Sequence, residues 1–243
     1  MLQGHFALRE CSLMDIGDNF SNSFDYAKRL FSDGGRLIIL IILDIIPIVD
    51  WIVVGYASRV LKEAPGGENP PKLENYGDLF INGAKVFFVS LIYMIIPLAL
   101  IGAGIGSFLS ALFMGGGLMA GTPQPMEAAG TMFLGGTGLV LLLVGAILAF
   151  LALIVLGAAI AHMIKEGKFG KAFAFGEILD VIRGIGWGKY LTWVVLVAII
   201  AVVVGAITGV IPFVGWLIEV VIAPAASVFF FRSLGLLYSD KNK

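Results

Sequence analysis

The chain has 243 residues, of which 59% are hydrophobic and 14% are charged, and its mean hydropathy is +0.98. Because soluble domains carry about a quarter charged residues, this composition excludes an ordinary soluble protein and indicates an integral membrane protein. The formal net charge of -1 leaves no excess of Lys and Arg to neutralise phosphates, which argues against nucleic acid as a partner.

The N-terminal residues 1–13, MLQGHFALRECSL, show no helical pattern, whereas periodicity begins directly after Met14. They also lack the long apolar core and small-residue cleavage site of a secretory signal peptide. A non-native or disordered extension over 1–13 and a native start at Met1 both stay open. We expect one polytopic membrane domain over 14–243. The single cysteine, Cys11, cannot form an intramolecular disulfide.

Apolar runs fall at about 36–62, 85–113, 132–164, 189–209 and 213–238, and a helix needs roughly 20 apolar residues to span a bilayer. The first run is interrupted by Asp44, Pro47 and Asp50. As one helix, it would place two carboxylates and a proline near the bilayer centre, at a high cost in free energy. A connection between two helices over these residues avoids that cost.

The interruption contains a phrase that occurs twice, IIPIVDW at 45–51 and VIPFVGW at 210–216. The second copy lies between two full-length apolar runs, so it must connect two helices. Proline favours a turn, Asp and Gly tolerate turn conformations, and tryptophan favours the lipid headgroup region. Both phrases are therefore predicted to be hairpin tips. Whether 36–62 forms two full spans or a re-entrant hairpin stays open.

The basic residues support a model of about six transmembrane helices in three hairpins. With tips at 44–50, 112–131 and 210–215, all sixteen Lys and Arg fall on the opposite side. Since cytoplasmic loops carry the excess of Lys and Arg, we expect a multi-pass protein of the cell membrane with both termini cytoplasmic.

An amphipathic segment that ends in glycine and a basic residue precedes each hairpin, at 24–36, 75–85 and 175–189. In the third, Phe175, Ile178, Leu179 and Ile182 recur at helical spacing. We interpret the segments as interfacial helices on the cytoplasmic surface. The alternative, polar loops that merely look amphipathic, stays open. The predicted fold is thus an all-α integral membrane protein with a threefold internal repeat.

The stretch from IIPIVDW through GYASRVLKE (55–63) and PGGENPP (65–71) to LENYGDLFINGAKVFFVSLIY (73–93) resembles a known membrane-protein family. This is the prokaryotic, largely archaeal family called domain of unknown function 4013. The resemblance extends from about residue 20 to 238. It implies a protein that crosses the membrane several times, and it implies no reaction.

Three carboxylates, Asp44, Asp50 and Glu219, map near the non-cytoplasmic face, where the model places no Lys or Arg. Ionisable residues in membrane segments are functional candidates, so these three form a candidate ion, proton or interaction site. The alternative is that they lie in water at the interface, where they cost little. His162 is a lone histidine near a helix end, which is a poor metal site and more typical of contact with terminal carbonyls.

Two pairs of glycines have the small-xxx-small spacing that lets helix backbones approach closely. They are Gly102 with Gly106, and Gly205 with Gly209. We expect each pair to contact another helix, within the chain or in a second protomer.

The sequence contains no HExxH, phosphate-binding loop, nucleophile elbow or dinucleotide-binding fingerprint. We therefore expect no enzyme, no catalytic residue, no metal and no cofactor. A structural or accessory protein that organises lipids, a homo-oligomer or a membrane partner is the favoured function, since midplane charges are absent. The alternative is a small transporter or channel with an acidic site through which ions enter from the non-cytoplasmic side.

Overall fold

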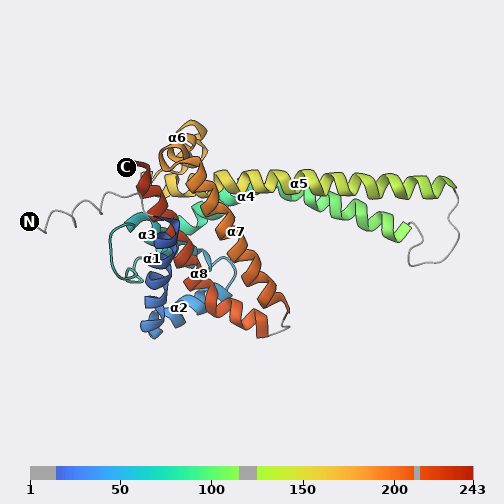
Figure 1. The fold of residues 1–243 in the computed structure, drawn as a ribbon. Coiled ribbons are helices and arrows are strands. Elements are labelled where there is room, and N and C mark those ends of the chain that lie inside the picture. Colours follow the sequence, from blue (N-terminus) through green and yellow to red (C-terminus); the bar gives the residue numbers. More distant parts are fainter. Residues whose placement is uncertain (1–14, 115–124, 211–213, 243) are drawn as a thin grey trace, which may run out of the picture. The chain divides into compact units, whose positions relative to one another are not determined.

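The computed structural model describes residues 15–114, 125–210 and 214–242, and every regular element in these ranges is helical (Figure 1). This confirms the all-α fold class. The predicted extension over 1–13 lies outside the described residues. The elements are α1 (Ile16–Lys28), η1 (Arg29–Ser32), α2 (Gly34–Ile45), α3 (Trp51–Glu63), α4 (Tyr76–Met114), α5 (Pro125–Glu166), η2 (Phe169–Phe173), α6 (Phe175–Ile185), α7 (Trp187–Val210), α8 (Val214–Ser239) and η3 (Asp240–Asn242).

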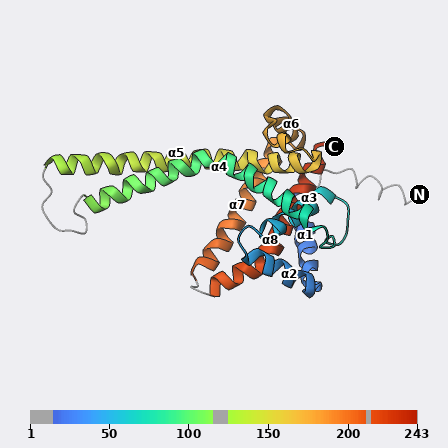
Figure 2. The same ribbon diagram turned by 180° about the vertical axis from the view of Figure 1, so that it is seen from behind.

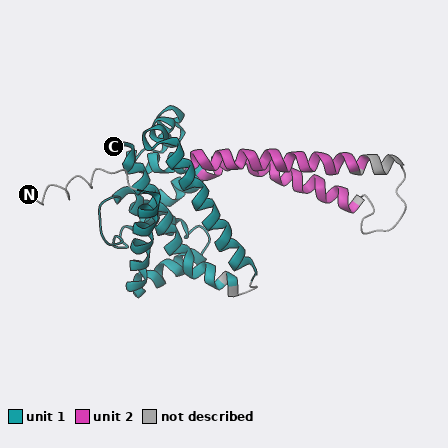
Figure 3. Cartoon of the chain, viewed as in Figure 1, with its two compact units in different colours: residues 1–89, 157–243 teal, residues 90–156 magenta. Residues whose placement is uncertain are grey.

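Contacts divide the chain into two compact units (Figure 3). Unit 1 comprises residues 1–89 and 157–243, and unit 2 comprises residues 90–156. All sixteen Lys and Arg belong to unit 1. The expectation of a single membrane domain over 14–243 stays a prediction.

Within the described residues, four helices are long and apolar enough to cross a membrane, which indicates a multi-pass membrane protein. They are Tyr76–Phe113, Met132–Glu166, Trp187–Val210 and Leu217–Ser239. By contrast, α2 and α3 have 12 and 13 residues. At about 1.5 Å per residue they are roughly 18–20 Å long, less than the ~30 Å hydrocarbon core. The structure therefore supports four spans and does not confirm six.

Helix α8 is the centre of unit 1, and α1, α2, α3 and α7 all pack against it. Both views of the ribbon show α1 and α8 side by side (Figures 1 and 2). The core combines apolar residues from α1–α3, the start of α4 and the middle of α8. It includes Leu30, Leu40, Tyr56, Leu79 and Val228. Close packing of these side chains attracts the short helices to α8, which is the main attraction between helices in a membrane.

The repeated phrase connects two consecutive helices in both places. In the first copy, residues 46–50 join α2 to α3, and in the second, α7 ends at Val210 and α8 begins at Val214. A Cβ atom at Gly215 would lie 1.7 Å from the carbonyl oxygen of Thr208, so no larger residue fits there. Asp50 has a right-handed helical backbone conformation, with φ -52° and ψ -26°. The glycine of the second copy is therefore a packing requirement that the first copy does not share.

The three segments expected to be surface helices differ from one another. The first contains the end of α1 and η1, and Asp33 accepts a hydrogen bond from the backbone nitrogen of Arg36 at the start of α2. The second, 75–85, is not a separate helix, because α4 runs without interruption from Tyr76. The third is a separate helix, α6, followed by Gly186 with φ 97°. Their position on a membrane surface stays a prediction.

In unit 2, the C-terminal part of α4 packs antiparallel to the part of α5 that ends at Leu156. Gly104 lies against Gly138 and Leu142, and Gly145 lies against Ile101. Much of the apolar surface of these helices is exposed, including Ile96, Leu143 and Ile147. Such surface requires lipid or another protein to cover it.

Candidate functional site

Five basic side chains of unit 1 meet at a polar loop after α3, residues 64–75. The segment contains Pro65, Pro70 and Pro71, so it cannot pair its backbone in a regular helix, and its carbonyl oxygens need other donors. Five cations supply them. Arg29 donates to the carbonyl of Glu68, Arg36 to those of Pro70 and Pro71, and Arg59 to that of Lys72. Arg232 donates to the carbonyls of Pro65, Gly66 and Gly67. Lys165 donates to the carbonyl of Ala64 and also to that of Lys62 at the end of α3.

Arg232 is the most buried of these cations, with 3% of its surface exposed. Its guanidinium carbon lies 4.3 Å from the centre of the Tyr26 ring, a cation–π contact. The Tyr26 hydroxyl donates to the carbonyl of Asn69 at 3.1 Å, and burial raises the pKa of Tyr26 to about 12. These contacts join α1, α8 and the loop in one polar cluster.

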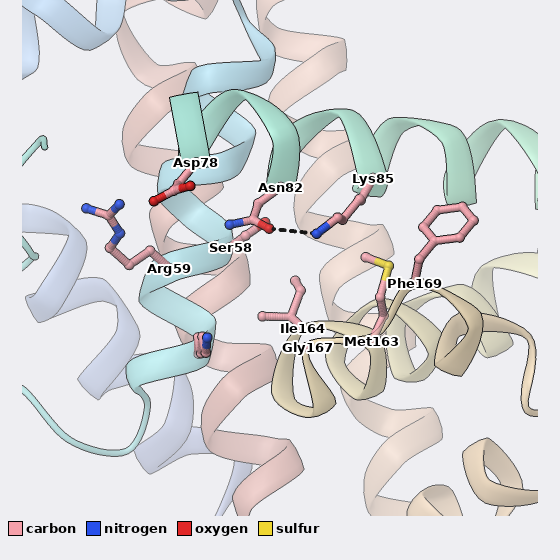
Figure 4. Close-up of a pocket in the computed structure, with 10 residues that line it drawn as sticks. Ser58, Arg59, Asp78, Asn82, Lys85, Met163, Ile164, Gly167 and Phe169 are labelled. Atoms are coloured by element: carbon pink, nitrogen blue, oxygen red, sulfur yellow. Dashed lines mark hydrogen bonds between the residues drawn. The ribbon is translucent and has the colours of Figure 1, made fainter. Parts of the chain in front are cut away.

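A separate pocket of about 310 Å³ lies between α3, the start of α4 and the end of α5 (Figure 4). We call it the basic pocket. Its polar lining residues are Ser58, Arg59 and Lys62 from α3 and Asp78, Asn82 and Lys85 from α4. Met163 and Ile164 from the end of α5, Gly167 and Phe169 complete the wall. The spacing 78, 82, 85 places the three α4 side chains on one helix face.

Close contact between two backbones brings the polar residues of α3 and α4 together. A Cβ atom at Gly55 would lie 1.8 Å from the carbonyl oxygen of Leu79, and one at Gly83 would lie 1.8 Å from that of Trp51. The Trp51 ring also stacks on Phe87, with centroids 5.0 Å apart. The start of α3 thus lies beside the third turn of α4.

The basic pocket carries three positive charges and one negative charge. Arg59 donates to the carbonyl of Lys72 at 3.3 Å, and Lys85 donates to Oδ1 of Asn82 at 3.4 Å. Among the residues that the structure describes, none of Arg59, Lys62 and Lys85 forms a salt bridge. The pocket is therefore an electropositive cavity, in which Asp78 offsets only one of three positive charges.

The acidic residues predicted to form a site are only partly brought together. Asp44 and Asp50 are both half-buried and are close enough for their negative charges to act on each other. Oδ1 of Asp50 is buried and has no hydrogen-bond partner within the described part of the chain. Glu219 is exposed on α8, and no hydrogen bond or ion pair among the described residues joins it to the other two.

The four glycines expected at helix contacts are exposed. A Cβ atom at Gly102, Gly106, Gly205 or Gly209 would have no neighbour within 4 Å in the described structure. In the run GAGIG the opposite face is used, since Gly104 makes the close contact with α5. Contact of the four glycines with a second protomer stays a prediction.

His162 belongs to a polar network that sequence reasoning missed. Its Nδ1 lies 2.9 Å from the Tyr238 hydroxyl, and its Nε2 lies 2.7 Å from a Glu177 carboxylate oxygen. Lys171 also bonds Glu177 at 2.6 Å. The Lys171 hydrogen bond, with a smaller contribution from His162, lowers the pKa of the Glu177 carboxyl, and Glu177 in turn raises the pKa of Lys171. The network joins α5, η2, α6 and α8.

The spacing in sequence gave no sign of this network, because Glu177 and Tyr238 are 15 and 76 residues from His162. No group of three or more His, Cys, Asp or Glu side chains in the described ranges could hold a metal ion.

Comparison with protein families gives a match over residues 37–213 to the family described as protein of unknown function (DUF4013). The chain belongs to this family. The match confirms the resemblance found in the sequence and covers α2 to α7, including the loop and all residues of the basic pocket. Comparison with curated proteins and with solved structures gives no match.

Proposed function

We propose that this member of the family is a structural or accessory protein of the cell membrane that organises lipids or a protein partner around its helices. The observation that carries the proposal is the exposure of three of the four candidate spans, those in α4, α5 and α7. Only 17% of the most apolar window of α4, 11% of that of α5 and 17% of that of α7 is buried. Helices that enclose a solute path bury polar faces against each other, whereas these present apolar side chains outward, where lipid or protein can cover them.

The proposed topology has four spans and both termini in the cytoplasm. Cations from α2, α3, α5 and α8 meet at the loop over 64–75, which supports a common side for the basic residues. Cytoplasmic segments carry the excess of Lys and Arg. The short pair α2–α3 then enters the membrane from the cytoplasmic side and returns to it, since Trp51 contacts Phe87 while α4 continues to Met114.

A small transporter or channel is the alternative, and one observation favours it. Asp50 has a buried carboxylate oxygen without a partner among the described residues, and Asp44 is its neighbour. A cation or a proton would relieve the repulsion between two such carboxyl groups.

Purification in mild detergent followed by native mass spectrometry tests the proposal. We expect bound phospholipid or a second protein chain to be retained. Proteoliposomes that contain pH-sensitive and cation-sensitive dyes should show the same flux as protein-free vesicles. Cation or proton flux that disappears in Asp50→Asn would overturn the proposal in favour of transport.

A further inference from the structure

We propose that the basic pocket binds the phosphate group of an anionic membrane lipid. The proposal rests on the lipid-organising function proposed above and names the chemistry that this function would use. Its basis is the combination of charge, position and shape in one cavity.

The cations of the basic pocket are arranged around a common space. Arg59 and Lys62 come from α3, and Lys85 comes from α4, so the two backbones that touch at Gly55 and Gly83 fix their separation. With Asp78 as the one acidic lining residue, the lining has a net formal charge of +2. Arg and Lys donate charge-assisted hydrogen bonds to phosphate oxygens, and a phosphodiester would supply the negative charge that the protein does not.

Asn82 adds a neutral donor. In Figure 4 it projects from α4 between Asp78 and Lys85, and its Oδ1 accepts from the Lys85 ammonium group. Its amide hydrogens can therefore point to another acceptor. Ser58 already donates to the carbonyl of Val54 at 2.9 Å, which leaves its oxygen as an acceptor only.

The position of the pocket corresponds to the depth of lipid headgroups. After Lys85, α4 contains no charged residue up to Met114, and α5 contains none from Met132 to Ala161. The pocket thus lies where both candidate spans change from apolar to charged sequence. Basic residues at this boundary attract anionic lipids.

The shape and lining favour a lipid over a soluble phosphate compound. Met163, Ile164 and Phe169 give the pocket an apolar wall beside its cations. A cavity of about 310 Å³ holds a headgroup and its glycerol but not two acyl chains, which would lie along the exposed apolar surface of the span. A soluble phosphate would gain nothing from this wall.

Titration of the full-length protein in detergent, monitored by native mass spectrometry, tests the proposal. The probes are short-chain phosphatidylglycerol, phosphatidylcholine of the same chain length, and inorganic phosphate. We expect saturable binding of phosphatidylglycerol at one site, and binding at least about tenfold weaker for phosphatidylcholine and phosphate. Arg59→Gln with Lys85→Gln should weaken phosphatidylglycerol binding about tenfold or more, because both variants remove a charged donor to the phosphate oxygens.

The matched control is Lys28→Gln with Arg183→Gln, which removes two exposed cations of unit 1 that do not line the pocket. It should bind phosphatidylglycerol like the wild type. If the pocket double variant does not fold, the affinity of Asp78→Asn for phosphatidylglycerol tests the proposal instead. This affinity should be higher than that of the wild type, because the variant removes the negative charge of the lining. Equal affinity in all variants would overturn the proposal. Binding of inorganic phosphate as tight as that of phosphatidylglycerol would overturn the assignment to lipid.

Failure of this inference and failure of the proposed function are distinguishable. Loss of the lipid site would leave the flux of proteoliposomes at background, whereas a transporter would raise the flux whatever the pocket binds.

Discussion

At the scale of single residues, the contact between α3 and α4 depends on two glycines. Gly55→Ala would place a methyl group 1.8 Å from the Leu79 carbonyl oxygen, so the helices would have to separate. Overpacking of this kind costs about 1–3 kcal/mol, and we expect a lower melting temperature in detergent. Gly77→Ala is the control, because Gly77 is exposed with no atom within 4 Å. Equal melting temperatures for the two variants would contradict the contact.

The Glu177 network predicts a dependence of stability on pH. Lys171 and His162 lower the pKa of Glu177 below its ordinary 4.5, so its stabilisation is complete above about pH 4.5 and is lost as the pH falls through the folded-state pKa. Glu177→Gln should therefore lower the melting temperature at pH 7, and the difference from the wild type should shrink as the pH falls through the lowered folded-state pKa. Glu74→Gln, an exposed residue, should have little effect over the same pH range. A difference between wild type and Glu177→Gln that does not change with pH would contradict this explanation.

Contacts of single residues could be predicted only in part, because they depend on which helices pack together. The run GAGIG has glycines on opposite faces, and spacing alone cannot show that Gly104 rather than Gly102 and Gly106 faces α5. The sequence shows that Arg59, Lys62 and Lys85 are present, but not that they line one pocket. Their proximity depends on the close backbone contacts at Gly55 and Gly83, which no local sequence pattern indicates.

At the scale of elements, the two copies of the repeated phrase are similar turns in different surroundings. Gly215→Asp, which makes the second copy resemble the first, should strongly reduce folded yield, because the Cβ atom would meet the Thr208 carbonyl oxygen at 1.7 Å. Asp50→Asn keeps the size of the side chain, and its folded yield should stay close to that of the wild type. We would measure both by size-exclusion chromatography in detergent. A folded Gly215→Asp protein at wild-type yield would show that α8 does not begin against Thr208.

The long apolar helices could be predicted because each contains a long stretch of mostly apolar residues, even though Glu219 and Arg232 interrupt the one in α8. The connection at 45–51 could also be predicted, from its proline and carboxylates. The lengths of α2 and α3 could not, because the apolar run over 36–62 covers parts of both helices and their connection and does not mark where either helix begins or ends. The sequence also did not show that α4 begins at Tyr76 and includes most of 75–85. The pattern of charged and apolar residues there is equally compatible with a separate surface helix.

At the scale of the whole molecule, all the Lys and Arg lie in unit 1 and none in residues 90–156. This distribution supports the proposal that the protein has one basic side and that this side lies at the cytoplasmic surface of the membrane. The family match over 37–213 shows the family of the chain but assigns no activity, so the proposed function is argued from the residues themselves. The basic pocket, the loop over 64–75 and the short pair α2–α3 all belong to that basic side.

Cysteine labelling with a membrane-impermeant maleimide tests this central claim most directly. In a Cys11→Ser background, single cysteines would replace Ile48, Glu68, Gly130 and Lys168. We predict that Gly130→Cys reacts from outside the cell. Glu68→Cys and Lys168→Cys should react only after permeabilisation. Ile48→Cys should not react from outside, because α2–α3 does not cross the bilayer. Labelling of Glu68→Cys or Lys168→Cys from outside would contradict the common cytoplasmic side, and labelling of Ile48→Cys together with Gly130→Cys would replace four spans by six.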